Sequence, residues 1–391
     1  MPESPPPVPE PRDRPAGGGL ENVVVGTTAI SHVDGARGFL VYRGHDAVSL
    51  AESGPFESVW HLLHQGALPD ASELERFRER VRAEATLVGP DLTAVVQAAL
   101  ASAPPGVPAT LAAVRSGLSA LAGRRSLRPW LERPLDELRD EVLGLAAAAA
   151  SVVVAASAAL LGREAAVPSG DSHAERYLHG LTGRAPAPSA VGALDRYLSL
   201  TADHGMNAST FVARVVTSTG ADAGAAVVAA LGALSGPLHG GAPGPVLQML
   251  DEIGRPERAR DWIVRRLHDG HRIMGFGHRI YRTDDPRAMS LRRTAIESGL
   301  GRAELAAAVE EAALEILAEM KPGRPLRTNV EFWAAVTLDG CGIPRDLFTT
   351  TFTVSRVVGW AAHIVEQAAD NRLIRPTVEY VGPLPDEARS A

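Results

Sequence analysis

Alanine- and leucine-rich segments account for most of the hydrophobic pattern along the chain. Apolar positions recur at helical spacing in five long stretches, which short runs of glycine and proline separate. The pattern predicts helices over residues 71–85, 135–161, 190–202, 221–234 and 303–320. The chain has no repeat of about 20 to 50 residues, which argues against a solenoid. The sequence therefore predicts a mainly all-α fold.

Strand-like patterns are confined to the start of the chain. Two runs, residues 22–30 and 38–42, are rich in β-branched and aromatic side chains, and they flank Asp34 and Gly35. An Asp-Gly pair favours a tight turn between strands. We therefore expect a small N-terminal β element.

One stretch, residues 144–162, carries no charged side chain and is long enough to raise the question of a membrane span. Alanine dominates it, and alanine is a weak hydrophobe but a strong helix former whose small side chain lets neighbouring helices approach closely. Neither a second span nor an aromatic belt accompanies the stretch. We therefore expect a buried central helix and no membrane partner.

The composition restricts the partners and the cellular setting. The chain has 391 residues, of which 45% are hydrophobic and 22% charged, and this suits one large or two modest globular domains. A formal net charge of −7 gives no overall positive field for nucleic acid. Cys341 is the single cysteine and the start of the chain lacks a secretory pattern, so we expect a reducing, cytoplasmic setting. Because Lys321 is the only lysine, we expect arginines to bind any anion.

Three short segments place a histidine in a context that a helical core does not require. They surround His204, His239 and His278. Glycines beside His239 and His278 permit unusual backbone angles and let a ligand approach the main chain. Metal binding is an alternative, but no His-x-His, HExxH or cysteine cluster supports it, so we expect no metal. The three segments therefore predict a ligand-binding site.

The segment GFGHRIYRTDDPR, residues 275–287, closely resembles the signature of the citrate synthase family, with matches at His278, Asp285, Pro286 and Arg287. Further family landmarks occur in the family's order: YRGHD, ADH, NAST, PLHGG, NVEF, FTVSR and GWAAH. The resemblance covers roughly residues 20–382. Several independent blocks in the right order form a specific signal.

This resemblance implies a citrate synthase-like homodimer, mainly all-α, in which two domains of each chain close over the substrates. It assigns residues 20–220 and 332–382 to the large domain and residues 221–331 to the small domain. Residues 1–19 are rich in proline and glycine and are expected to form a disordered tail. Residues 383–391 are expected to form a C-terminal tail.

The family's reaction condenses acetyl-CoA with oxaloacetate and hydrolyses citryl-CoA to citrate and CoA, with no metal or redox cofactor. A thioester methyl is a very weak acid, so a carboxylate removes its proton only if the developing enolate is stabilised. The resemblance assigns Glu331 as this base and His239 as the neutral donor to the thioester oxygen. It assigns His278 as the donor to the ketone oxygen of oxaloacetate.

The remaining expected site residues bind the two substrates. Planar arginine side chains suit the carboxylates of a dianion, and the resemblance assigns this role to Arg287, Arg356 and Arg375, the last from the second subunit. It adds His204 and Phe352 to the oxaloacetate pocket. The expected contacts with CoA are Met274, Gly275, Phe276 and Gly277 at the adenine and Arg282 at a phosphate.

The base position departs from the better-known family pattern, because Glu331 stands in place of aspartate and Thr328 in place of proline. Glutamate is one methylene longer, and a misplacement of ~1 Å can lower a rate on the order of a hundredfold. Three interpretations stay open: a citrate synthase, a 2-methylcitrate synthase that uses propionyl-CoA, and a non-catalytic protein that binds carboxylates or acyl-CoA. One methylene changes binding in a pocket by only about 1 to 3 kcal/mol, so the sequence does not decide the acyl group.

Overall fold

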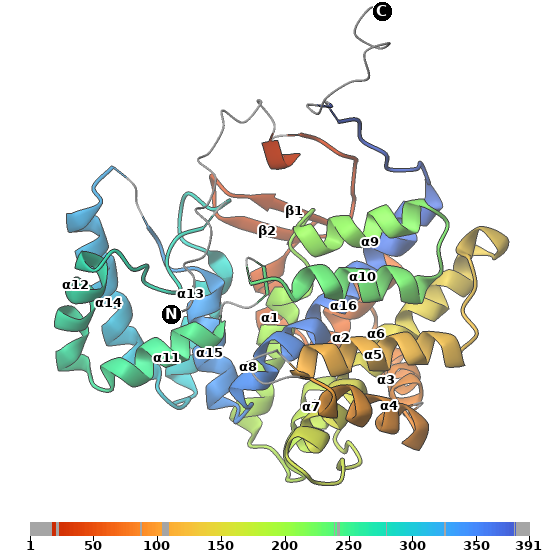
Figure 1. The fold of residues 1–391 in the computed structure, drawn as a ribbon, viewed down its shortest axis with the longest axis horizontal. Coiled ribbons are helices and arrows are strands. Elements are labelled where there is room, and N and C mark those ends of the chain that lie inside the picture. Colours follow the sequence, from red (N-terminus) through yellow and green to blue (C-terminus); the bar gives the residue numbers. More distant parts are fainter. Residues whose placement is uncertain are drawn as a thin grey trace, which may run out of the picture.

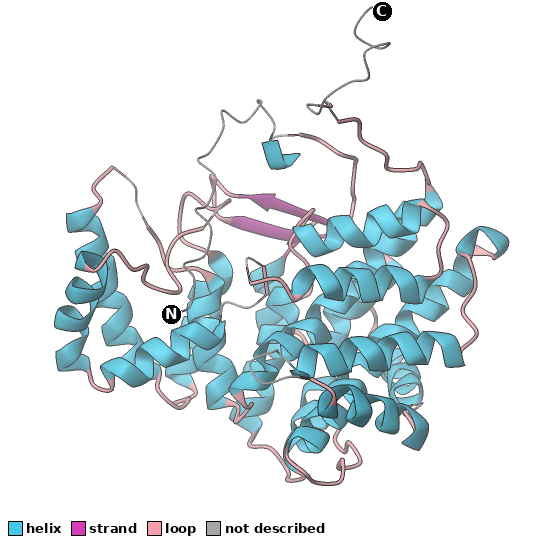
Figure 2. Ribbon diagram, viewed as in Figure 1, coloured by secondary structure: helices cyan, strands magenta, loops and turns pink. Residues whose placement is uncertain are grey.

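The computed structural model describes residues 18–20, 23–86, 88–103, 109–237, 239–240, 243–278, 280–323, 326–378 and 380. Within this part of the chain it contains sixteen α-helices and one three-stranded sheet (Figures 1 and 2). The expected mainly all-α fold with a small N-terminal β element is confirmed. Of the two expected tails, residues 1–17 and 383–391 lie outside the described residues.

The helices follow one another with short connections. Along the chain they are α1 (Ala47–Ser53), α2 (Phe56–Gln65), α3 (Ala71–Ala85), α4 (Pro90–Ala101), α5 (Ala109–Arg124), α6 (Leu135–Leu160), α7 (His173–Thr182), α8 (Pro188–Thr201), α9 (Ala208–Ser218), α10 (Ala223–Leu234), α11 (Pro243–Ile253), α12 (Ala259–His268), α13 (Pro286–Glu297), α14 (Ala303–Met320), α15 (Val330–Gly340) and α16 (Phe348–Ala369). All five helices that the hydrophobic pattern predicts are present, with ends shifted by two residues at most.

Two long helices, α6 and α16, pack against each other in the hydrophobic core. Helix α5 also packs on α6, and α9 packs on α16. Helix α6 is long and apolar enough to cross a membrane, yet 89% of its most apolar 18-residue stretch is buried inside the fold. Alanine makes this possible, because its small side chain lets neighbouring helices approach on every side. The expected buried central helix is confirmed.

The sheet differs in part from the expectation. Its strands are β1 (Ser31–Asp34), β2 (Phe39–Tyr42) and β3 (His45–Asp46), antiparallel and in that spatial order. The strand expected over residues 38–42 is confirmed, but the strand expected over residues 22–30 is wrong. The valines of residues 22–30 favour a β-strand, but a strand also needs a neighbouring strand to pair with. In the described residues, β2 pairs with Ser31–Asp34 instead.

The turn between β1 and β2 contacts the loop that carries His278. The carbonyl oxygen of Gly35 accepts a hydrogen bond of 2.8 Å from the backbone N–H of Arg282. A Cβ atom on Gly35 would lie only 2.3 Å from the carbonyl oxygen of Ile280, so this close approach requires glycine. The N-terminal sheet thus positions a loop that belongs to a distant part of the sequence.

Two groups of helices are visible in Figure 1, and α11, α12 and α14 lie in the smaller group on the left. Helices α13 and α15 pack against each other and against α8, and so they connect the smaller group to the larger one. Helix α10 packs against α9, α5 and α16. The division into domains at residues 220 and 331 stays a prediction.

Candidate active site

A cavity of about 1190 Å³ lies where the loops that carry the three histidines meet the starts of α13 and α15. The expected site residues that line it are His204, His239, Gly277, His278, Arg287, Glu331, Phe352 and Arg356. The structure therefore brings the three expected catalytic groups and two of the three expected arginines to one cavity. The role of each residue stays a prediction.

The other expected residues, Met274, Gly275, Phe276, Arg282 and Arg375, do not line this cavity. Arg282 and Arg375 are exposed, and Arg375 lies in the extended segment that follows α16. Gly275 has a φ of +86°, and a Cβ there would lie 2.7 Å from Cβ of Phe332, so this position requires glycine. The ring of Phe276 packs on Phe332 at a centroid distance of 5.4 Å. In this chain these two residues therefore fix the shape of the loop before His278.

The ring of His278 is oriented by its own loop. Its Nδ1 atom accepts hydrogen bonds of 2.9 Å from the backbone N–H groups of Ile280 and Tyr281. Burial and the charge of Arg287 lower the pKa of His278 to about 4, so the ring is neutral at pH 7. Because Nδ1 is an acceptor, the proton of the neutral ring is on Nε2. His278 therefore has an Nε2–H group available as a donor.

His239 is held by the start of α9. Its Nε2 atom lies 2.8 Å from Oγ of Ser209, which also accepts a hydrogen bond of 3.1 Å from the indole N–H of Trp360. Burial and Arg356 lower the pKa of His239 to about 4, so this ring is also neutral. Nε2 also accepts a hydrogen bond of 3.4 Å from the backbone N–H of Ser209, so the proton of the neutral ring is on Nδ1. Sequence reasoning missed Ser209, although it lies in the NAST block.

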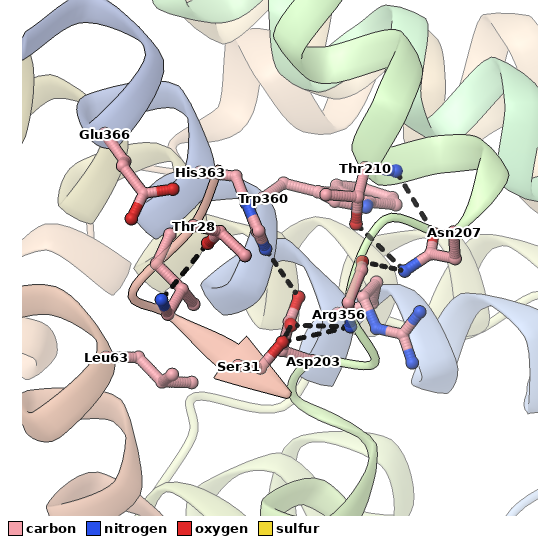
Figure 3. Close-up of polar contacts among 12 residues, drawn as sticks. Thr28, Ser31, Leu63, Asp203, Asn207, Thr210, Arg356, Trp360, His363 and Glu366 are labelled. Carbon is pink, nitrogen blue, oxygen red and sulfur yellow. Dashed lines mark hydrogen bonds and ion pairs between the residues drawn. The ribbon is translucent and has the colours of Figure 1, made fainter. Parts of the chain in front are cut away.

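The loop that carries His204 is fixed by a buried carboxylate. Asp203 is fully buried, and it accepts hydrogen bonds from the hydroxyl of Ser31 and, at 3.0 Å, from the backbone N–H of Gly205 (Figure 3). Burial and the charge of Arg287 lower the pKa of His204 well below its ordinary value. His204 is therefore a third neutral histidine at the cavity.

The same carboxylate connects the cavity to the start of the chain. Nε2 of His363 lies 3.3 Å from Oδ1 of Asp203, and Nδ1 of His363 accepts from Nε of Arg214 at 3.0 Å. Arg214 pairs with Glu366, which accepts from the backbone N–H of Ala29 at 2.8 Å. Figure 3 shows Glu366 and His363 on one helix, beside the segment that leads into β1. This network anchors the segment whose residues 23–26 line the cavity.

Arg287 and Asp285 form a buried, bidentate ion pair. Nε of Arg287 donates to Oδ1 of Asp285 at 3.0 Å, and Nη2 donates to Oδ2 at 2.8 Å. Burial lowers the pKa of Arg287, but Asp285 raises it more, so the net pKa lies above its ordinary value. Oδ2 of Asp285 also accepts from the backbone N–H of Val330 at 3.1 Å. Asp285 therefore links Arg287 to the start of the helix that carries Glu331.

Arg356 extends from α16 and is 2% exposed. Its Nε donates to the carbonyl oxygen of Thr201 at 2.9 Å, and its guanidinium lies 4.6 Å from the centroid of the Phe352 ring. Burial lowers the pKa of Arg356, and Asp203 opposes this effect. Arginine stays charged under such conditions, so Arg356 adds a second fixed cation to the cavity.

Glu331 lies in the first turn of α15, where the side chain of Asn329 accepts its backbone N–H at 3.1 Å. The helix start and the arginines predict a low pKa for this carboxylate. The structure differs: burial raises the pKa of Glu331 to about 7, and Arg287 and Arg356 only oppose this effect in part. A carboxylate with a pKa near the working pH is suited to general-base catalysis.

Comparisons with known proteins agree along nearly the whole chain. A family model described as "Citrate synthase, C-terminal domain" matches residues 19–377. The chain is 38% identical to citrate synthase 2 of Bacillus subtilis over 376 residues, which cover 93% of this chain and 95% of that protein. It is 37% identical to citrate synthase of Haloferax volcanii over 381 residues, with the same two coverages.

Solved structures give the same result. Citrate synthase from Pyrobaculum aerophilum matches with a TM-score of 0.83 and 33% identity, covering 95% of each chain. Citrate synthase from Thermoplasma acidophilum, solved as a ternary complex with carboxymethyl coenzyme A and oxaloacetate, matches with a TM-score of 0.84 and 28% identity. The match covers 96% of this chain and 100% of that one.

The relatives and structural neighbours are enzymes that catalyse a condensation, and this chain is an enzyme of that class. The non-catalytic interpretation is therefore not retained. The chain belongs to the citrate synthase family, and the resemblance seen in its sequence is confirmed.

Proposed function

We propose that the protein condenses oxaloacetate with acetyl-CoA and hydrolyses the resulting citryl-CoA to citrate and CoA. The observation that carries this proposal is the cavity, on which three neutral histidines, two buried arginines and one carboxylate converge. The arginines suit a dianionic substrate, and neutral histidines supply hydrogen bonds without adding charge. CoA enters as a substrate thioester, so the proposed chemistry needs no metal and no redox cofactor.

In the first step, Glu331 removes a proton from the acetyl methyl group while His239 donates a hydrogen bond to the thioester oxygen. The enolate carbon then attacks the ketone carbon of oxaloacetate, while Nε2–H of His278 donates a hydrogen bond to the ketone oxygen. That oxygen takes up one proton, equal to the proton removed from the methyl group, and becomes the hydroxyl of citryl-CoA. Water then hydrolyses the thioester of citryl-CoA. The pKa of about 7 for Glu331 supports the role of base, because a much lower pKa would make the carboxylate too weak a proton acceptor.

A second copy of the chain completes the proposed site. Arg375 is exposed and does not line the cavity of its own chain, and we assign it to the oxaloacetate site of the partner subunit in a homodimer. Mixing Arg287→Ala chains with Arg375→Ala chains tests this. One of the two sites in each mixed dimer then has both arginines, so we expect a purified mixed dimer to have about half of the wild-type activity. Verified mixed dimers without activity would contradict the shared site.

Release of the CoA thiol tests the reaction and the acyl group together. Acetyl-CoA and propionyl-CoA are each supplied with and without oxaloacetate. We expect release that depends on oxaloacetate and is faster with acetyl-CoA. Faster release with propionyl-CoA would instead identify a 2-methylcitrate synthase. Absence of release with both thioesters, in protein that binds oxaloacetate, would contradict the proposal.

A further inference from the structure

Tyr281 is a buried tyrosine beside the cavity that none of the roles above uses. It lies between His278 and the start of α13, is 4% exposed and does not line the cavity itself. Its hydroxyl lies 3.3 Å from Nε2 of His204. Its ring centroid lies 4.7 Å from that of His278 and 5.6 Å from that of His204. One side chain therefore contacts two of the three histidines.

Tyr281 also contacts an arginine that lines the cavity. The guanidinium of Arg287 lies 5.8 Å from the centroid of the Tyr281 ring, within the range of a cation–π contact. The family resemblance assigns His204, His278 and Arg287 to oxaloacetate, and the proposed function takes these assignments over. Within the described part of the chain, Tyr281 thus contacts the oxaloacetate side of the site and makes no comparable contact with Glu331 or His239.

The chemistry of the hydrogen bond to His204 gives it a direction. Burial raises the pKa of Tyr281 to about 12, so the phenol keeps its hydrogen at neutral pH. The ring of His204 is neutral and has one donor and one acceptor nitrogen. A carboxylate accepts hydrogen bonds but donates none, so His204 must present an N–H group to oxaloacetate. With Nε2 beside Tyr281, that group is Nδ1–H, and Nε2 must then accept from the phenol.

We propose that Tyr281 is a positioning residue for oxaloacetate, whose hydroxyl donates to Nε2 of His204 and fixes the tautomer with Nδ1–H toward the substrate. The proposal rests on the proposed function, because it takes oxaloacetate as the ligand. Without the hydroxyl, the His204 ring is free to carry its proton on either nitrogen. Only one of these two forms donates to the carboxylate, so binding weakens while the acyl half of the site is unaffected.

Calorimetric binding of oxaloacetate to the full-length Tyr281→Phe variant tests this. The variant keeps the aromatic ring and removes only the hydroxyl. We expect the Kd for oxaloacetate to rise about three- to tenfold, the scale of one hydrogen bond, and the KM for acyl-CoA to stay unchanged. The matched control is Tyr177→Phe, which removes another buried hydroxyl, 2.8 Å from Oγ1 of Thr351 and away from the cavity. The control is expected to bind oxaloacetate like the wild type.

A double-mutant cycle separates positioning from packing. If Tyr281 acts through His204, then Tyr281→Phe has no further effect on oxaloacetate affinity in a His204→Ala background. An equal loss in both backgrounds would overturn the proposal, because it would mean that the hydroxyl acts independently of His204. A wild-type Kd for Tyr281→Phe would overturn it as well.

Nitrogen-15 spectra of histidine-labelled wild-type protein test the same point without relying on the folding of the Tyr281→Phe variant. The signals of His204, assigned by their loss in His204→Ala, are expected to show a protonated Nδ1 and an unprotonated Nε2. The opposite pattern would overturn the proposal. Failure of the wild type to bind oxaloacetate would contradict the proposed function instead, so the two failures are distinguishable.

Discussion

The two sides of the cavity are held in different ways. On the side that we assign to oxaloacetate, Arg287, Arg356 and His278 each have a partner within the chain that fixes their direction. On the side that we assign to the acyl group, His239 is also held, by Ser209. The cavity is lined as well by small apolar side chains close to these groups in the sequence, Ala208 and Ala334. Glu331 is fixed there through its backbone at the start of a helix.

This difference follows from what each substrate demands. A dianion needs charges and donors that are in place before it binds, because reorganising them would consume the binding energy. An acyl group needs only a space of the right shape, and one methylene changes its binding by about 1 to 3 kcal/mol. We therefore expect recognition of oxaloacetate to be strict and the choice of acyl group to depend on small differences in packing.

The largest effect is expected from Glu331→Gln, which removes the proposed base and keeps the shape of the side chain. General-base catalysis contributes about 10²- to 10⁴-fold, so we expect condensation to fall by about a thousandfold while oxaloacetate affinity stays nearly intact. Exchange of the acetyl-CoA methyl protons with deuterated solvent, in the presence of an unreactive oxaloacetate analogue, should stop. Wild-type turnover by this variant would show that another carboxylate is the base.

Glu331→Asp sharpens the same test, because it restores the aspartate of the family pattern. If the backbone near Thr328 has adjusted to the longer side chain, the shorter carboxylate falls short of the methyl group and kcat drops. A misplacement of ~1 Å corresponds to a loss on the order of a hundredfold. A rise in kcat would instead show that glutamate is the less suitable base at this position.

Arg287→Ala breaks the oxaloacetate side. The variant loses a donor to the substrate and leaves Asp285 buried without its ion-pair partner, so both binding and folding suffer. We expect the Kd for oxaloacetate to rise about a hundredfold and the midpoint of thermal unfolding to fall. Arg292→Ala is the matched control, because Arg292 lies on the same helix and pairs with Glu310 away from the cavity. An unchanged Kd would show that Arg287 does not bind oxaloacetate.

Lysine provides a further comparison at the same position. Arg287→Lys keeps the positive charge, but it cannot form both of the hydrogen bonds to Asp285. We therefore expect it to restore only part of the oxaloacetate affinity. Full restoration would mean that charge alone matters at Arg287 and that the geometry of the ion pair does not.

The pH dependence of activity tests the acyl side. Burial raises the pKa of Glu331 to about 7, so the carboxylate becomes protonated as the pH falls below that value. We expect kcat/KM to fall about tenfold per pH unit below pH 7, because kcat/KM follows the protonation of a required base in the free enzyme. A profile that stays flat down to pH 5 would contradict the assignment of Glu331.

As the pH rises, Glu331 should contribute less to the stability of the fold, although activity rises over the same range. Between the ordinary pKa of 4.5 and the folded value of about 7, the folded state holds a proton on Glu331 that the unfolded state has lost. The contribution of this group to the free energy of unfolding is therefore greatest at low pH, and it declines as the pH rises through this window. Chemical denaturation of wild type and Glu331→Gln at several pH values should show this difference, and identical pH profiles would contradict it.

The fold could be predicted where packing follows from a local pattern. The uncharged residues 144–162 predicted a buried helix because alanine on every face leaves no polar side for solvent, and residues 144–160 lie in α6. Residues 22–30 did not form the expected strand. The β preference of valine is a property of single residues, whereas a strand forms only where another strand pairs with it. The segment that pairs with β2 is β1, which follows residues 22–30.

The cavity could be predicted where each sequence block supplies one chemical group directly. Residues that act through another side chain were missed: Ser209 contacts His239 across 30 positions, and Tyr281 contacts His204 across 77. No periodicity encodes such contacts, because the fold alone brings the partners together. The pKa of Glu331 was missed for the same reason, since the sequence reveals its charged neighbours but not its burial.

The smallest effect is expected from Arg282→Ala, which tests the assigned contact with a CoA phosphate. The backbone N–H of Arg282 donates to Gly35 and remains in the variant, so the loop keeps its position. An exposed ion pair contributes about 0.2 to 1 kcal/mol, which corresponds to a rise of about 1.4- to fivefold in the KM for acyl-CoA, with the KM for oxaloacetate unchanged. Added salt should reduce this difference, because it screens exposed charges. Arg124→Ala, at another exposed arginine outside the cavity, is the control. Equal changes in both KM values would indicate that the loop had moved, and no change in either would place the CoA phosphates elsewhere on the surface.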